Sequence, residues 1–383
     1  MAAPGAPYLV VAGEASGDAM AARVVARVRQ RAIGMGGPAL ARAGAELVVR
    51  DLGLASMGPL GALRRAGRLA RAYSKLLESA LAARTRVALL VGFSAFNARL
   101  GRALRRRGTR VLWYAPPQVW AWRSSRVTRL AHSCDRVALL FPFEAQHWRA
   151  TAVEVEHVGH PSLENRYEGR AGLRRRLGLA DRELAIALLP GSRDGEVRRT
   201  LEPMLDAAAA LAAPTASSRS PRSRADEPPR CALLLAESLS PALQRWARTQ
   251  AQRAGVAVLT GCSGLPAFDA AFATSGTVTL ECALAEVPPV IVYRTDPLTG
   301  WLARQLLETP YVGLPNAILG RPAFPELLQS RMNAANLAAE MQHVLTRREQ
   351  YREACLAVRA RTERPGVLLP SERVAGLLES WLT

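Results

Sequence analysis

Short apolar runs that favour β-strands alternate along this chain with longer segments that favour helices. This alternation is typical of parallel sheets that are covered by helices on both faces. Because 383 residues are too many for one ordinary core, the pattern predicts two doubly wound α/β domains that face a cleft. The expected strands are residues 8–12, 46–49, 87–92, 110–114, 136–141 and 155–158, followed by 184–189, 231–236, 256–259, 268–273 and 289–293.

The boundary between the domains is expected in the polar, Arg-rich stretch 162–180. We therefore expect one domain at residues 1–165, a second at 175–345, and C-terminal helices at 346–383. A terminal helix in such architectures often crosses back to brace the other domain. Residues 213–230 are rich in Pro, Ser and Arg and have almost nothing to bury, so they are predicted to be a disordered insertion.

The charge balance is strongly positive, with 51 Lys and Arg against 32 Asp and Glu and a net charge of +19. Such a field favours anionic partners, namely nucleic acid, an acidic membrane surface or a phosphorylated substrate. The sequence has no helix-turn-helix, aromatic-platform or zinc signature, so no specific nucleic-acid partner is expected. Its five cysteines lack metal-ligand spacing, which indicates reduced thiols, no metal and a cytoplasmic protein. No apolar run approaches the ~20 residues that span a bilayer.

The segment Ser275–Glu281, Ser-Gly-Thr-Val-Thr-Leu-Glu, joins an apolar run to the start of a predicted helix. A Ser275-Gly276-Thr277 turn at a helix N-terminus leaves backbone N–H groups unpaired, and an anion, usually a phosphate, can bind there. Glu281 follows about one and a half turns into the helix, where its carboxylate could accept hydrogen bonds from ribose hydroxyls. The segment is equally compatible with a nucleotide-diphosphate site and with a capped helix that carries a solvated Glu.

A second turn that suits a diphosphate follows the predicted strand 184–189. There Pro190-Gly191-Ser192-Arg193 places a guanidinium and free N–H groups at the carboxyl end of the strand. We therefore expect Arg193 to bind a diphosphate and to stabilise charge as it develops on the leaving group.

The first strand ends in Gly13-Glu14-Ala15-Ser16-Gly17-Asp18, and a helix is expected to begin at Ala19. Asp18 is placed to cap that helix. Glu14 is a carboxylate in a tight turn, which suggests acid–base chemistry. A purely structural capping role fits these residues equally well.

An aromatic, Pro-locked loop, Tyr114 to Arg123, follows the strand 110–114. Trp120 could contact a sugar or an acyl chain there, although core packing of Trp120 and Trp122 is the simpler interpretation. His160, in Gly159-His160-Pro161, is interpreted as a hinge or loop residue.

The chain carries, in this order, the short motifs GEASGD, PPQVWAWR, FPFE, VGHP, LLPGSR, SGTVTLE, VGLPN and PELLQ. This ordered set spans residue 8 to about residue 330 and resembles the lipid-A-disaccharide synthase family. The resemblance implies two Rossmann-like domains of the GT-B glycosyltransferase type, without a cofactor. It also implies an inverting, metal-independent transfer of diacylglucosamine from UDP to diacylglucosamine 1-phosphate (lipid X), and it allows a homodimer. Ser16, Asn97 and Asn316 join the expected substrate-binding residues.

One motif departs from the family. Where the family carries D-x-P-D-F-N, this chain has Gly92-Phe93-Ser94-Ala95-Phe96-Asn97, so Gly92 and Ala95 replace the two carboxylates. Neither can take a proton from the acceptor hydroxyl. Glu14 or Asp18 could supply the base instead. Otherwise the protein is a catalytically impaired homologue that binds UDP-sugar or lipid, or it acts on a variant acceptor.

Residues 58–84 are predicted to attach the first domain to the cytoplasmic face of the inner membrane. An apolar face is flanked by basic residues there, as in helices that lie on an anionic surface. The alternative is that this face packs on the domain's own sheet. The apolar residues are Leu60, Leu63, Ala66, Ala70, Tyr73 and Leu77, and the basic residues are Arg64, Arg65, Arg68, Arg71 and Lys75.

Overall fold

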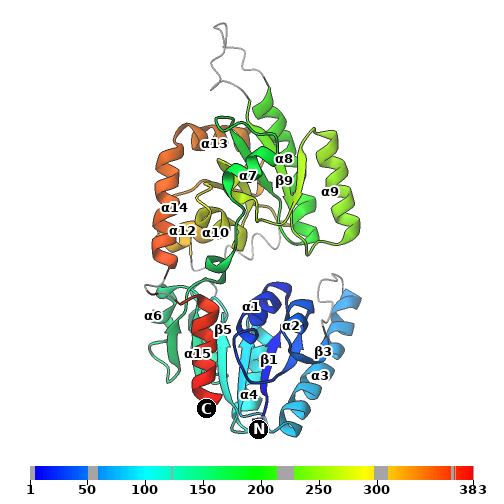
Figure 1. Cartoon of the computed structure of the whole chain (residues 1–383), viewed down its shortest axis with the longest axis vertical. Helices are drawn as coiled ribbons and strands as arrows, with labels where there is room; N and C mark the ends of the chain where they lie inside the picture. The colour runs from blue at the N-terminus through cyan, green and yellow to red at the C-terminus, as the bar shows by residue number, and fades with distance from the viewer. Residues whose placement is uncertain are drawn as a thin grey trace. The chain divides into compact units, whose positions relative to one another are not determined.

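The structure is a computed structural model that describes residues 5–50, 59–121, 124–213, 228–296, 309–363, 366 and 368–382. The chain divides into two units (Figure 1). Unit 1 contains Met1–Glu164 and Thr362–Thr383, and unit 2 contains Asn165–Arg361. Most of the predicted insertion, residues 214–227, lies outside the described residues. None of the described helices is long and apolar enough to cross a membrane.

Unit 1 is built on a parallel sheet whose strand order is β3-β2-β1-β4-β5-β6-β7. Sequence patterning missed β2 because its residues, Ala-Ile-Gly-Met-Gly, suggest a turn. Gly34 is needed there, since a β-carbon would lie 1.8 Å from the carbonyl oxygen of Val10 on the neighbouring strand. The strands are β1 (Tyr8–Ala12), β2 (Ala32–Gly36), β3 (Glu46–Arg50), β4 (Val87–Val91), β5 (Arg110–Tyr114), β6 (Arg136–Leu139) and β7 (Glu154–His157).

Helices cover both faces of this sheet (Figure 1). The last of them, α15 (Pro370–Leu382), comes from the C-terminal end of the chain and packs against α1, β4 and β5. It buries Val374 and Leu378 completely. The others are α1 (Ala15–Val25), α2 (Pro38–Arg42), α3 (Pro59–Ala82), α4 (Ser94–Arg105), α5 (Val127–Ala131) and α6 (Ala145–Trp148).

The second half of α3 packs on the sheet of unit 1. Ala72, Leu76 and Ala80 are buried in the core beside β-strand residues, and Tyr73 and Leu77 are partly buried against the same core. For this half of the helix the alternative interpretation, packing on the domain's own sheet, is therefore correct. The side chains of residues 60–65, which include Leu60 and Leu63, lie outside the described residues.

Unit 2 is built on a second parallel sheet, with the order β10-β9-β8-β11-β12-β13. The three-residue edge strand β13 was too short for the sequence pattern to predict. The strands are β8 (Ala185–Leu189), β9 (Arg230–Leu235), β10 (Ala257–Thr260), β11 (Ala270–Thr274), β12 (Pro289–Tyr293) and β13 (Glu326–Leu328). The helices are α7 (Arg170–Arg176), α8 (Asp194–Ala212), α9 (Pro241–Arg253), α10 (Thr277–Leu284), α12 (Leu314–Leu319), α13 (Ala334–Thr346) and α14 (Arg348–Thr362).

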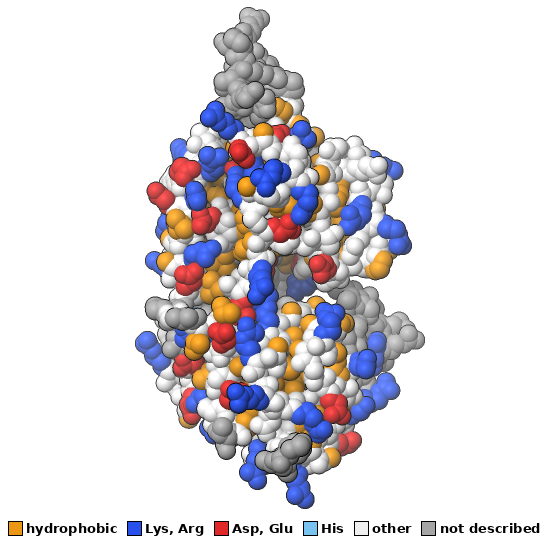
Figure 2. Space-filling model, in the orientation of Figure 1, with side chains coloured by type: hydrophobic (Ala, Val, Ile, Leu, Met, Phe, Trp, Pro, Cys, Tyr) orange, Lys and Arg blue, Asp and Glu red, His pale blue; other side chains and the backbone are white. Residues whose placement is uncertain are grey.

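Both sheets are doubly wound, which confirms the predicted α/β fold class of two Rossmann-like sheets. In unit 1 the strand order reverses between β1 and β4, and in unit 2 it reverses between β8 and β11. Ligands of open α/β sheets bind outside the carboxyl ends of the strands at such a reversal. Lys and Arg side chains lie on the visible surface of both units (Figure 2).

Candidate functional site

The two predicted diphosphate-binding turns of unit 2 follow neighbouring strands at the reversal point. Pro190 to Arg193 follow β8, and Ser275 to Thr277 follow β11. The register pairs Ala273 with Leu189, so both turns leave the same edge of the sheet side by side. The fold therefore brings together the residues that the sequence predicted for one anion site.

The Ser275–Thr277 turn exposes a helix N-terminus. Gly276 precedes α10 with a φ angle of 143°, a conformation that favours glycine. Ser275 anchors the turn, because its N–H donates to Val292 O at 2.8 Å and its hydroxyl donates to Val312 O at 2.7 Å. The N–H groups of Gly276 and Thr277 have no acceptor among the described residues, and both residues are exposed. This end of α10 can bind an anion.

In the other turn, in contrast, the N–H groups of Ser192 and Arg193 are not free. The Oε2 atom of Glu196 lies 3.3 Å from the N–H groups of both Ser192 and Arg193. The other oxygen, Oε1, lies 2.9 Å from Nη1 of Arg193. A β-carbon on Gly191 would lie 2.7 Å from Oε2, so the glycine lets the carboxylate sit against the turn. The prediction of free N–H groups here is therefore wrong, because a carboxylate within the chain engages them.

Glu281 is half-buried and belongs to a polar cluster within unit 2. Asn165 Nδ2 donates to its Oε1 at 3.1 Å, and Tyr167 donates its hydroxyl to the Glu281 carbonyl at 3.4 Å. The Cys262 thiol also hydrogen-bonds Glu281, and burial raises the pKa of that thiol to about 12. Glu281 is thus not the solvated side chain of the alternative interpretation.

Asn316 is completely buried and makes its hydrogen bonds within the chain. Its Nδ2 donates to Phe324 O at 2.9 Å and to Glu326 Oε1 at 2.8 Å, and its Oδ1 accepts from Phe324 N at 2.8 Å. These bonds engage the amide within the chain, and the predicted contact of Asn316 with a ligand stays a prediction. Asn316 positions the loop that carries Gly313.

Glu326 is a residue that sequence reasoning missed. Its carboxylate accepts from the N–H groups of Val312 and Gly313, each at 3.0 Å. The Val312 carbonyl in turn accepts from the Ser275 hydroxyl, so Glu326 supports the turn before α10 through one intervening residue. Glu326 lies within the PELLQ motif, so its membership of that motif was the available signal.

In unit 1 the reversal point lies between the turns that follow β1 and β4. Gly13 and Phe93 pack closely there, since a β-carbon on Gly13 would lie 2.4 Å from the Phe93 ring. Glu14 and Ser16 are exposed, and Glu14 lines a small pocket of about 90 Å³ with Gly37 and other residues. The exposed carboxylate of Glu14 therefore lies at the position where ligands of open α/β sheets bind.

Asp18 was predicted to cap α1, but the structure shows that it does not. The helix begins at Ala15, so Glu14 is its N-cap, and Asp18 lies in the first turn with 6% of its surface exposed. Its carboxylate accepts from Gly37 N at 2.7 Å, Ala39 N at 2.9 Å and Leu40 N at 3.2 Å. Asp18 therefore caps the neighbouring helix α2, and a carboxylate used in this way is a poor candidate for a base.

Asn97 is also buried and holds a turn. Its Nδ2 donates to Val91 O at 3.2 Å and to Gly92 O at 2.9 Å. Gly92 and Phe93 both adopt left-handed conformations, with φ angles of 52° and 47°, and Asn97 stabilises this unusual pair. Ala95, in place of a family carboxylate, is exposed in the first turn of α4. Asn97 Nδ2 thus has a structural role, while its buried Oδ1 has no hydrogen-bond partner among the described residues, and the predicted substrate contact stays a prediction.

Trp120 is held by a buried carboxylate that sequence reasoning missed. Its Nε1 donates to Glu144 Oε1 at 2.9 Å, while Glu144 Oε2 accepts from Leu140 N at 3.0 Å and Phe141 N at 3.2 Å. Burial raises the pKa of Glu144 to about 7. Glu144 ends the FPFE motif, which was the available signal. His160 is buried beside Phe141, and burial lowers its pKa to about 3.

Comparison with known proteins gives a consistent result along the whole chain. The family model described as lipid-A-disaccharide synthetase matches residues 8–365. The lipid-A-disaccharide synthase of Myxococcus xanthus is 36% identical over 348 residues, which cover 88% of this chain and 87% of that protein. The enzyme of the same name from Anaeromyxobacter sp. (strain K) is 36% identical over 389 residues, or 97% of each chain.

Solved structures match at the level of the fold. A putative UDP-N-acetylglucosamine 2-epimerase from Listeria monocytogenes superimposes with a TM-score of 0.63 at 12% identity, covering 98% of this chain and 96% of that one. The glycotransferase of kitacinnamycin superimposes with a TM-score of 0.57 at 13% identity, covering 99% and 100%.

Proposed function

The chain belongs to the lipid-A-disaccharide synthase family, and from this premise we propose how its residues carry out the hexosyl transfer. It is a glycosyltransferase of lipid A biosynthesis that joins diacylglucosamine from UDP to a second diacylglucosamine. The observation that carries the assignment is the family match over residues 8–365, which runs through both units.

The donor is proposed to bind at the reversal point of unit 2. The exposed N–H groups of Gly276 and Thr277 would hold the diphosphate, together with Arg193 in the turn that follows the neighbouring strand β8. The leaving group gains negative charge as its bond to the sugar breaks, and these donors would stabilise that charge. Glu281 would accept from ribose hydroxyls, and Asn165 would help to orient its carboxylate.

The acceptor is proposed to be diacylglucosamine 1-phosphate, with Glu14 as general base. In an inverting transfer the acceptor hydroxyl attacks the anomeric carbon as the carbon–oxygen bond to UDP breaks. The hydroxyl proton must pass to a base, and Glu14 is exposed at the reversal point of unit 1 while Asp18 is already engaged by three N–H groups. Ser16 and Trp120 are proposed to contact the acceptor.

Attachment to the cytoplasmic face of the inner membrane is also proposed. Arg68, Arg71 and Lys75 are exposed on α3, and each basic residue near an anionic bilayer contributes about 1 kcal/mol. The buried stripe of Ala72, Leu76 and Ala80 belongs to the core. The attaching surface would therefore be the exposed basic side chains of α3 and not this stripe.

An assay of UDP release tests the proposed reaction. The purified chain should release UDP from UDP-diacylglucosamine when lipid X is added, and a disaccharide 1-phosphate should appear in equal amount. Without lipid X, release should fall to the background of donor hydrolysis. Absence of the disaccharide with both substrates present, from a protein that binds UDP, would overturn the proposal.

A further inference from the structure

The turns that enter β4 and β5 repeat one short sequence at the amino edge of the unit 1 sheet. Arg84-Thr85-Arg86-Val87 enters β4, and Gly108-Thr109-Arg110-Val111 enters β5. The two turns are joined, because the Thr109 hydroxyl donates to Thr85 O at 3.2 Å and Arg110 N donates to Arg86 O at 2.9 Å. The repeat therefore places Arg86 and Arg110 side by side at the starts of neighbouring strands.

The first residue of each turn has a left-handed conformation. The φ angle is 79° at Gly108, where glycine suits it, and 51° at Arg84, where an L side chain is disfavoured. The arginine costs about 1 kcal/mol relative to glycine at such a position. Local stability thus does not account for a guanidinium at residue 84.

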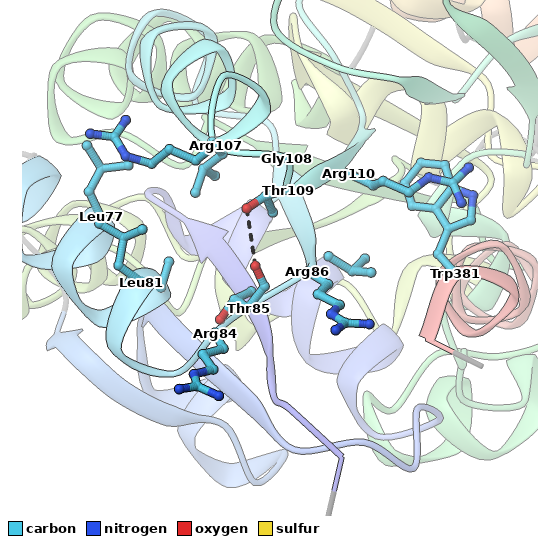
Figure 3. A pocket seen from close by; sticks show the side chains of 13 residues that line it. Leu77, Leu81, Arg84, Thr85, Arg86, Arg107, Gly108, Thr109, Arg110 and Trp381 are labelled. Carbon is cyan, nitrogen blue, oxygen red and sulfur yellow. Dashed lines mark hydrogen bonds between the residues drawn. The ribbon is translucent and has the colours of Figure 1, made fainter.

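Four arginines surround a hollow of about 560 Å³ at these turns (Figure 3). They are Arg84, Arg86, Arg107 and Arg110, all exposed, and no Asp or Glu is among the residues that line the hollow. None of the four forms an ion pair with a described residue. Positive charge is therefore concentrated here without an internal counterion.

Helix dipoles account for only part of this concentration. The carboxyl ends of α3 and α4 favour cations. Of the four arginines, however, Arg107 alone donates to a helix carbonyl of the described chain, with its Nη1 3.1 Å from Ala103 O. The adjoining surface adds Arg102, Arg106 and Arg129, and the one carboxylate among its described lining residues, Asp135, already pairs with Arg105 at 2.9 Å.

Trp381, from the C-terminal helix α15, closes one side of the hollow (Figure 3). The guanidinium carbon of Arg110 lies 4.1 Å from its ring centroid, and that of Arg136 lies 5.0 Å away. An arginine stacked on an aromatic ring keeps its N–H donors at the edge of the guanidinium plane. The ring therefore orients Arg110 without using its hydrogen-bonding capacity.

We propose that this amino-edge pocket, made by Arg84, Arg86, Arg107, Arg110 and Trp381, binds the phosphate group of an anionic ligand. Guanidinium groups that have no ion-pair partner can each donate two parallel N–H bonds to the oxygen atoms of a phosphate. The pocket is separate from the proposed catalytic edge, because five-residue strands of about 3.3 Å per residue lie between the two edges. The phosphate belongs either to a lipid headgroup or to a soluble phosphorylated compound.

Two probes distinguish these sources. Calorimetry with inorganic pyrophosphate tests the soluble ligand, and flotation with phosphatidylglycerol vesicles tests the lipid. The double substitution Arg86→Ala and Arg110→Ala should weaken binding to the matching probe at least roughly tenfold, as expected for the loss of charged hydrogen bonds. The double substitution Arg245→Ala and Arg253→Ala removes the same charge from exposed positions on α9 and should change neither measurement.

Pyrophosphate could also bind the proposed donor site, so Arg193→Ala separates the two events. The Arg193→Ala variant should still bind pyrophosphate at the amino-edge pocket, whereas the Arg86/Arg110 double variant should not. Because Trp381 lines the pocket, pyrophosphate binding should change its fluorescence, and Trp381→Phe should abolish that change. Arg84→Gly removes a guanidinium while suiting the left-handed backbone, so it should weaken binding in a protein at least as stable as the wild type.

The vesicle and pyrophosphate measurements together test whether the pocket binds phosphate. If the Arg86/Arg110 double variant loses only vesicle binding, the ligand is a lipid phosphate. If it loses only pyrophosphate binding, the ligand is a soluble phosphate. If the wild-type protein binds neither probe at low salt, or if Arg84→Gly and the Arg86/Arg110 variant bind both probes as the wild type does, the pocket is not a phosphate site.

Discussion

The Arg193 guanidinium is held 2.9 Å from Glu196, one turn further along α8. The same carboxylate faces the N–H groups of Ser192 and Arg193, so it engages the donors that a diphosphate would need. A nucleotide at this turn has to displace or share that carboxylate. The donor affinity therefore depends on both residues, in opposite directions.

Arg193→Ala should weaken UDP binding by roughly 1.5–3 kcal/mol, because a hydrogen bond between charged groups is lost. Isothermal calorimetry measures the change. Arg199→Ala, two turns into the same helix and also exposed, is the matched control and should leave UDP affinity unaltered. Equal UDP affinity of the Arg193 variant and the wild type, with the fold intact, would remove Arg193 from the donor site.

Glu196→Gln should have the reverse effect and tighten UDP binding by about 1 kcal/mol. The neutral amide no longer repels the diphosphate or competes as an ion for Arg193. Glu202→Gln, an exposed carboxylate further along α8, is the control for a general change in charge. Weaker binding in the Glu196 variant would mean that the carboxylate mainly positions Arg193.

Glu14→Gln should lower turnover by ~10²–10⁴, because the amide keeps the size of the side chain but cannot accept the proton. UDP affinity should persist, since the donor is assigned to unit 2. Steady-state disaccharide formation and UDP calorimetry together give the comparison. Glu46→Gln, an exposed carboxylate at the start of β3, should turn over normally. A near-native rate in the Glu14 variant would exclude it as the base.

Asp18→Asn should act on stability. The carboxylate accepts hydrogen bonds from three N–H groups at the start of α2. The amide of Asn has only one acceptor oxygen, and its NH₂ group would face these donors. We expect a loss of about 1–3 kcal/mol in the free energy of unfolding, measured by urea denaturation. Asp181→Asn, at an exposed position, should cost little. An unchanged free energy of unfolding for Asp18→Asn would contradict the capping role.

Glu144→Gln should change how stability depends on pH. Burial raises the pKa of Glu144 to about 7, above its ordinary value of 4.5, so the folded state favours the protonated acid. The protonated acid therefore contributes to the free energy of unfolding, and this contribution is fully present below about pH 4.5. It is lost as the pH rises through about 7, and the total loss is about 3 kcal/mol. Between pH 5 and pH 8 the wild type should lose stability relative to the variant. A difference that is independent of pH would contradict this assignment.

The location of the motifs was predictable from the sequence, but the partners of their side chains were not. Because apolar strands alternate with helices, the strands are parallel and the turns after β8 and β11 lie at the same edge of the sheet. The SGT and PGSR segments are therefore neighbours. The PGSR turn is engaged by the nearby Glu196, but the Ser275 hydroxyl of the SGT turn donates to Val312 O, which is distant in sequence. Asp18 reaches Gly37, and Asn316 reaches Glu326, through pairings that no local pattern encodes.

Two of the predicted substrate-binding residues are engaged within the chain in a similar way. Asn97 and Asn316 carry amides that hydrogen-bond backbone groups, and both side chains are buried near the starts of helices. Among the residues that remain exposed at the reversal points are Glu14, Ser16, Arg193 and the Gly276–Thr277 turn, and the fold leaves these available for a ligand.

The return of α15 to unit 1 has a consequence for the order in which the protein is made. Val374 and Leu378 complete the core of a sheet whose strands are synthesised first, while all of Asn165–Arg361 is translated in between. On the ribosome the second unit can therefore finish folding before the first. Until translation reaches the last helix, the nascent first unit keeps an uncovered apolar face, which is the stage at which the chain is most exposed to aggregation and to capture by chaperones.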